Sequence, residues 1–233
     1  KKGSIKVHTV MHANEGVPSD IRFTSAATND SFMLKPAGFS AGDLLAIDRA
    51  YIDYAKFEEL TRRGVIYVTK MKKNLKYEII RDTMYQTSEG LMELRIQHVV
   101  FTKMVKDSEP IRHHARLITY VDLKKGKARL ISLLTNDTEM EPEDIIAIYR
   151  KRWEIELIFK QLKQNFPLRY FYGESANAIK IQIWVTLIAN LLLMVIQRRI
   201  KRPWSFSGLA TEVRIMLMYY VNIYSFLEEP EKD

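Results

Sequence analysis

Apolar and polar residues alternate through the middle of the chain, between Leu75 and Asn136. Four stretches there have a period of two, which is typical of strands with one buried face. Turn-forming residues separate the stretches at 88–90, 107–110 and 124–127. The pattern predicts a four-stranded antiparallel meander.

Shorter elements precede this meander. The apolar run Leu44–Ile47 has the length of a buried strand and ends at Asp48. Asp53 is a suitable N-cap for a helix that stops at Gly64. The elements predicted before the meander are strands at 5–12, 20–27, 44–47 and 65–71, a short helix at 30–35 and a helix at 54–63.

Helical periodicity returns after the meander. A helix is predicted from Glu141 to Asn165, followed by Pro167, which ends it. Two further helices are predicted at 176–200 and 207–227. Lys180, Gln182 and Asn190 interrupt the apolar run of the first, so we interpret it as a helix buried against a sheet rather than a membrane span.

Four polar residues share one face of the predicted helix 141–165. At 100° per residue, they fall within a stripe of about 60° that apolar residues border on both sides. These residues are Tyr149, Arg152, Glu156 and Lys163. Charge-rich helices usually carry such residues on a solvated face with ion pairs, which is the alternative interpretation.

The composition indicates which kind of molecule the chain binds. The 233 residues carry a formal net charge of +8, which favours a polyanion, nucleic acid before membrane. No cysteine is present, so disulfides and thiolate metal sites are excluded. The chain begins at lysine and its first residues lack the apolar core of a signal peptide. We expect it to be a piece of a longer protein.

Two carboxylates are candidates for metal-dependent phosphoryl transfer, in which clustered carboxylates hold two divalent ions. Asp48 follows a predicted strand, and the carboxyl ends of strands in α/β sheets face ligand-binding crevices. Its alternative role is to form a turn or cap a helix. Glu156 lies between cations and could instead form a structural ion pair.

The spacing Tyr149-x2-Arg152-x3-Glu156-x6-Lys163 resembles the Y-R-E-K signature of bacterial cut-and-paste insertion-sequence transposases with a DDE active site. The block 44–74 is similar to the family's block around its second catalytic Asp, which Asp48 matches. Residues 1–18 and 170–193 resemble the segments after the first Asp and after the motif. The resemblance covers about residues 1–200, in the family's order.

The resemblance implies an α/β fold with a ribonuclease-H-like (DDE) catalytic core. This core would lack its first strand here and would carry an antiparallel β insertion and C-terminal helices. Residues 1–74 would form the first part of the core and 75–137 the insertion. Residues 138–233 would form the second part, with the helix of the catalytic Glu. The first catalytic Asp would lie upstream of residue 1, so we expect this fragment to be inactive.

The resemblance also implies roles. Asp48 and Glu156 would be catalytic and would bind Mg²⁺ or Mn²⁺, two ions in the complete site. The other motif residues would bind the phosphates of the transposon end, and a basic group would lie at the mouth of the site. These DNA-binding residues are Tyr149, Arg152, Lys163, Lys70, Lys72 and Lys73.

The implied reaction is strand cleavage at the element's ends, hairpin formation and strand transfer. Its partner is double-stranded DNA, both element ends and target, bound by a homodimer in a synaptic complex. No membrane is involved, and the location is the bacterial cytoplasm, at the nucleoid. Two alternatives stay open: a degenerate, non-catalytic DNA-binding remnant of a transposase, and another ribonuclease-H-like nuclease.

Overall fold

The computed structural model describes residues 4–87, 93–124, 126–168, 170–219 and 222–229. The predicted turn at 88–90 lies outside these residues. Contacts divide the chain into two compact units. We call Thr24–Trp153 the sheet unit, and Lys1–Phe23 with Glu154–Asp233 the helical unit. Each unit is described by itself.

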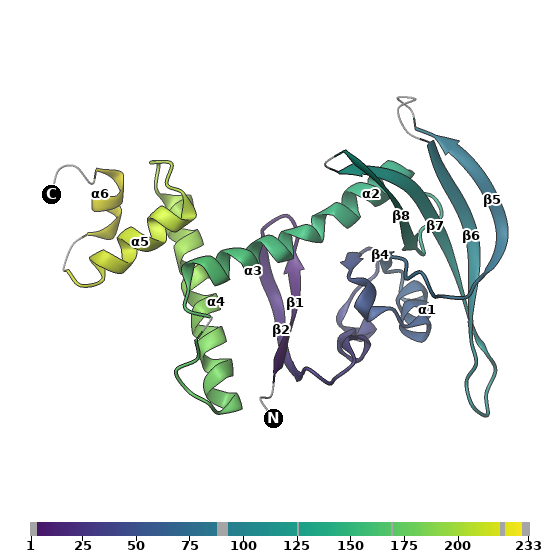
Figure 1. Ribbon diagram of the computed structural model, residues 1–233, viewed down its shortest axis with the longest axis horizontal. Coiled ribbons are helices and arrows are strands. Elements are labelled where there is room, and N and C mark those ends of the chain that lie inside the picture. Colours follow the sequence, from purple (N-terminus) through teal and green to yellow (C-terminus); the bar gives the residue numbers. More distant parts are fainter. Residues whose placement is uncertain (1–3, 88–92, 125, 169, 220–221, 230–233) are drawn as a thin grey trace. The chain divides into compact units, whose positions relative to one another are not determined.

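A six-stranded mixed sheet forms the sheet unit, in the order β3-β4-β8-β7-β6-β5 (Figure 1). The predicted antiparallel meander is confirmed as β5 to β8, and β8 continues the sheet onto β4. β3 pairs with β4 in parallel, with Ile47 opposite Thr69. The strands are β3 Leu44–Ile47, β4 Ile66–Lys70, β5 Glu78–Gln86, β6 Glu93–Lys103, β7 Ile111–Lys124 and β8 Lys127–Thr135.

The expectation that 44–47 is a buried strand is wrong. β3 lies at the edge of the sheet, and Leu44 is exposed while the other three residues are half-buried. An apolar run alone does not distinguish an edge strand from a central one, because the neighbouring strand is set by long-range pairing. β3 therefore presents one unpaired edge among the described residues.

The helix predicted after Asp53 is confirmed as α1, Tyr54–Arg62. Asp53 caps it by accepting a hydrogen bond from the Ala55 N–H at 3.1 Å. Gly64 follows at φ +72°, a conformation that favours glycine at the end of a helix. Three short 3₁₀ helices complete this region: η1 Asp30–Met33, η2 Pro36–Gly38 and η3 Arg49–Tyr51.

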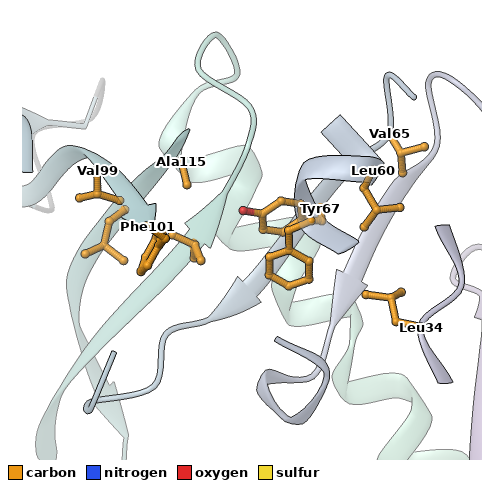
Figure 2. Packing of buried hydrophobic residues seen from close by; sticks show 10 residues of the cluster. Leu34, Leu60, Val65, Tyr67, Val99, Phe101 and Ala115 are labelled. Atoms are coloured by element: carbon orange, nitrogen blue, oxygen red, sulfur yellow. The ribbon is translucent and has the colours of Figure 1, made fainter. Parts of the chain in front are cut away.

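Helices cover both faces of the sheet. On one face α1 packs Phe57 against Tyr67 of β4, with ring centroids 4.0 Å apart. Phe101 of β6 is also fully buried in this cluster, part of which Figure 2 shows. On the other face α2, Pro142–Lys151, packs Ile145 against Val68 and neighbouring strand residues. Tyr67 and Val68 are consecutive residues of β4, so their side chains point to opposite faces of the sheet.

Among its described residues, the helical unit contains a two-stranded sheet and four helices. The predicted strand 5–12 is confirmed as β1, and the next strand begins at Val17, earlier than expected. The long helix 176–200 is confirmed as α4. The elements are β1 Ile5–His12, β2 Val17–Ser25, α3 Trp153–Asn165, α4 Ala176–Arg199, α5 Phe206–Met216 and α6 Ile223–Glu228.

Two predicted helices are wrong in extent. The single helix 141–165 is two helices, α2 and α3, which meet at Arg152. The Arg152 N–H bonds to the Tyr149 carbonyl at 3.2 Å, an i→i−3 contact that tightens the turn there. The helix predicted at 207–227 is α5 and α6, because Asn222 caps a new helix through the Tyr224 and Ser225 N–H groups.

The break at Arg152 changes the interpretation of the polar stripe. Tyr149 and Arg152 belong to the sheet unit, whereas Glu156 and Lys163 belong to the helical unit. The stripe is therefore described in two parts, one in each unit.

By length and composition, α4 is the one helix in the described part of the chain that could cross a membrane. Its polar residues are nevertheless used in packing. Gln182 Nε2 donates to the Pro167 and Tyr170 carbonyls, at 3.0 and 2.7 Å, and Gln161 donates to Asn190 Oδ1 at 3.0 Å. These bonds join α4 to α3 and to the segment after α3.

Candidate active site

Asp48 follows β3 directly and starts η3. Its Oδ1 accepts a hydrogen bond from the Ala50 N–H at 2.9 Å, so the capping role is realised. Its Oδ2 lies 3.4 Å from Arg152 Nη1, and 43% of the side chain is exposed. One carboxylate oxygen thus stabilises the backbone, the other faces a cation, and the side chain as a whole is partly exposed to solvent.

Arg152 and Tyr149 meet Asp48 at the end of α2. The Arg152 guanidinium carbon lies 5.5 Å from the centroid of the Tyr149 ring, within the range of a cation–π contact. Burial raises the pKa of the Tyr149 hydroxyl, and the positive charge of Arg152 opposes that rise. The phenol is therefore neutral at physiological pH and can donate a hydrogen bond.

The basic group after β4 lies at the same sheet edge as Asp48. β3 and β4 are parallel neighbours, so their carboxyl ends coincide. Asp48 follows the last residue of β3, and Lys70 is the last residue of β4. Lys72 and Lys73 follow in a turn, where Lys73 is exposed. The pairing thus places Lys70 at the same sheet edge as Asp48, and the DNA-binding role of the three lysines stays a prediction.

Tyr51 is a neighbour of Asp48 that the sequence analysis missed. Burial, together with the nearby charges of Asp30 and Asp48, raises the pKa of the Tyr51 hydroxyl to about 12. The signal was an aromatic residue three positions after Asp48, within η3. Asp30 reaches the same neighbourhood from η1, through a loop whose path the sequence does not reveal.

Glu156 and Lys163 lie on α3, in the helical unit. Glu156 is in the first turn, where its negative charge suits the positive end of the helix dipole, and its Oε2 is buried. Lys163 is exposed in the last turn. The structure thus brings Asp48, Tyr149 and Arg152 together and places the other two motif residues in the other unit.

The donor set suits a hard divalent cation only in part. Carboxylate oxygens are the ligands that Mg²⁺ and Mn²⁺ prefer, and Asp48 offers one from a partly exposed position. Among the described residues, no group of three or more histidine, aspartate or glutamate side chains could hold a metal ion. Asp48 by itself therefore offers a single carboxylate to a cation in the sheet unit.

A mixed sheet covered by helices on both faces, with an aspartate at a strand end beside an arginine and a tyrosine, is compatible with a ribonuclease-H-like domain. Residues 1–192 match the family model described as "Transposase DDE domain". The chain belongs to this family.

Named transposases are among its relatives. A Sinorhizobium fredii protein named "Putative transposase y4zB" is 27% identical over 201 residues, covering 85% of this chain and 56% of the relative. A Synechocystis protein named "Putative transposase for insertion sequence element IS4SA" is 30% identical, covering 64% and 40%. "Transposase for insertion sequence element IS231B" of Bacillus thuringiensis subsp. berliner is 20% identical, covering 64% and 40%. The chain spans about half the length of the curated relatives it matches.

Proposed function

We propose that this chain is the catalytic domain of a DNA transposase that cuts and joins DNA at the ends of an insertion sequence. The observation that carries the proposal is the grouping of Asp48, Arg152 and Tyr149 at the end of β3, in a chain of the Transposase DDE domain family. A carboxylate, a guanidinium and a phenol at one sheet edge suit the recognition of a phosphodiester beside a bound cation.

Asp48 and Glu156 are the proposed ligands of Mg²⁺ or Mn²⁺. When bound, such ions activate a water or hydroxyl nucleophile and neutralise charge on the leaving oxygen. Arg152 is already beside Asp48, at 3.4 Å from its Oδ2, so it can hold a phosphate next to that carboxylate. Tyr149 donates its neutral hydroxyl, while Lys163, Lys70, Lys72 and Lys73 bind backbone phosphates as point charges.

The finer steps are part of the same proposal. Cleavage at the element's end frees a 3′-hydroxyl, which attacks the opposite strand to give a hairpin that is reopened before strand transfer. The protein works as a homodimer on paired ends, in the bacterial cytoplasm at the nucleoid. The Y-R-E-K assignment of Tyr149, Arg152, Glu156 and Lys163 belongs to this proposal as well.

The free edge of β3 supports a further part of the proposal. A strand from outside these residues would pair with β3 and carry the first catalytic aspartate, completing the carboxylate set. Residues 1–74 and 138–233 would then be the two parts of the ribonuclease-H-like core, with 75–137 as its insertion. These 233 residues alone would cleave no DNA, because one catalytic carboxylate is missing.

Metal-dependent cleavage by the complete protein tests the proposal. The substrate is DNA carrying the element's own ends, and the variants are Asp48→Asn and Glu156→Gln. Glu154→Gln, on the same turn of α3 as Glu156, is the matched control. We expect Mg²⁺ or Mn²⁺ to support end-specific nicking that each catalytic substitution lowers by about 100-fold or more, because losing even a partner of a metal ligand typically costs about 10- to 100-fold. The control should keep wild-type activity.

Other results would favour the alternatives. A protein that binds the ends tightly but never cuts them is the non-catalytic remnant. Metal-dependent cutting without preference for the ends indicates another nuclease of this fold. Cutting that survives both substitutions contradicts the assignment of Asp48 and Glu156.

A further inference from the structure

A groove of about 1120 Å³ lies within the helical unit, where the end of α3 meets α4 and α5. Its floor is apolar and includes Leu193, Ile196 and Val213. Ligand pockets for small molecules usually measure about 300–1,000 Å³, so this groove lies just above the upper end of that range.

The charged groups on the groove are cationic. Lys163 comes from the last turn of α3 and Arg214 from the last turn of α5, and both are exposed. No acidic side chain is among the described residues that line the groove. Arg214 donates one hydrogen bond to the Asn165 carbonyl at 3.0 Å, which leaves further guanidinium donors for a ligand. The charge pattern suits an anion with a large apolar or aromatic body.

An aromatic platform borders the same groove. Phe166 and Tyr170 line it, and Tyr170 is 77% exposed. Gln182 of α4 fixes the segment that carries them by donating to the Pro167 and Tyr170 carbonyls and accepting from the Tyr172 N–H at 3.1 Å. The Tyr170 backbone carbonyl is therefore bonded to α4, while the Tyr170 side chain is open to a stacking partner.

We propose that this groove binds unpaired nucleotides of single-stranded DNA. Bases stack on Tyr170 and Phe166, and the adjoining phosphates contact Lys163 and Arg214. Non-specific single-strand sites combine a basic track with aromatic side chains in this way. The inference rests on the proposed function for its choice of DNA as the anion. It adds a site for strands that cleavage releases, in the helical unit and built by groups other than the carboxylates.

Binding of a fluorescent dT₁₂ oligonucleotide and of a duplex of the same length, measured by anisotropy with the 233-residue chain, tests the inference. Tyr170→Ala should weaken dT₁₂ binding roughly fivefold to a hundredfold, the range for one lost base–aromatic stack, and leave duplex binding nearly unchanged. Tyr170→Phe should restore it. The control is Tyr172→Ala, because Tyr172 is 87% exposed and is not among the groove's lining residues.

Charge is tested separately. Lys163→Gln and Arg214→Gln should each reduce the salt dependence of dT₁₂ binding by about one phosphate contact, which Lys160→Gln on the outer surface of α3 should not do. Equal losses from Tyr170→Ala and Tyr172→Ala, or equal losses on dT₁₂ and duplex, would overturn the inference. A third result would also overturn it. If the chain is a dimer without DNA, and Leu217→Asp dissociates this dimer but does not weaken dT₁₂ binding, the groove holds a second copy of the chain and not DNA.

Both proposals use Lys163, but they can fail separately, because cleavage by the Asp48 and Glu156 variants tests one and dT₁₂ binding by the Tyr170 variants tests the other. If Tyr170→Ala weakens dT₁₂ binding of the 233-residue chain but the complete protein never cleaves DNA, only the catalytic proposal is contradicted. If the complete protein cleaves DNA at the ends but Tyr170→Ala leaves dT₁₂ binding unchanged, only the proposal for the groove is contradicted.

Discussion

The main core of the sheet unit and the long helix α4 of the helical unit differ in how their apolar side chains are covered. In the sheet unit, Phe57, Tyr67 and Phe101 have no exposed surface, and helices cover both sheet faces. In the helical unit, Val185, Ile188 and Leu192 of α4 are between 54% and 59% exposed. The helical unit has a core of its own, since Leu209 and Leu227 are also fully buried. It differs in that one long helix, α4, carries a row of exposed apolar side chains, a kind of surface that often binds a partner.

The largest effect is expected from the sheet unit's core. Phe57→Ala removes the ring stacked on Tyr67 and should lower the free energy of unfolding by about 3–5 kcal/mol. Phe32→Ala changes the same residue type at an exposed position of the same unit and should cost little. Urea denaturation followed by circular dichroism measures both. Similar losses for the two variants would show that burial does not set the stability of this unit.

A smaller loss is expected from the buried polar network beneath that core. Tyr67 Oη lies 2.6 Å from His113 Nε2, and His113 Nδ1 lies 3.0 Å from Glu58 Oε2. Tyr67→Phe leaves the buried His113 nitrogen without this partner, so we expect a loss of about 1–3 kcal/mol. Tyr77→Phe, on a partly exposed side chain, is the control and should lie within about 0.5 kcal/mol of wild type.

His113 should make the sheet unit sensitive to acid. Burial lowers the pKa of His113, and the bond to Glu58 only partly opposes this, so the unfolded chain takes up a proton more readily than the folded one. Neutral His113 therefore contributes its full stability to the folded state above the ordinary histidine pKa of about 6.5. This contribution to the free energy of unfolding is lost as the pH falls from there through the lower pKa of the folded state.

Urea midpoints at neutral pH and at about pH 5 measure this dependence. His113→Gln should reduce the acid sensitivity, whereas the control His114→Gln, at an exposed position on the same strand, should keep it. An unchanged dependence in His113→Gln would assign the effect to other groups, among them His98, whose pKa burial also lowers.

The smallest effect is expected on the exposed face of α4. Ile188→Ser should change the free energy of unfolding by only about 0.5 kcal/mol, because the side chain is already 54% exposed. A loss as large as that of Phe57→Ala would mean that this face is buried in the working protein, which would remove the contrast between the two units.

The elements that the sequence predicts well are those set by local pattern. The meander follows from period-two alternation, and α1 follows from the Asp53 cap and Gly64. The break at Arg152 escaped prediction because neither glycine nor proline marks it. The edge position of β3 escaped it too, because strand order depends on pairing between distant segments.

The candidate site likewise has parts that the sequence predicts and parts that it does not. Asp48 could be proposed from its place after an apolar run, and the parallel pairing of β3 with β4 explains why Lys70 lies at its edge. The contact of Arg152 with Asp48 joins residues far apart in sequence, and only the family resemblance grouped them beforehand. Tyr51 and Asp30 were missed because their loop geometry is not encoded in any periodicity.

The central claim is that Asp48 and Glu156 bind the same metal site. Iron(II), which substitutes for Mg²⁺ and cuts nearby backbone in the presence of ascorbate and peroxide, tests it most directly in the complete protein. We predict cuts near both Asp48 and Glu156, suppressed by excess Mg²⁺ and both abolished by Asp48→Asn. If Asp48→Asn removes only the cut near residue 48, or leaves both cuts, the two carboxylates do not share a site and the account is contradicted.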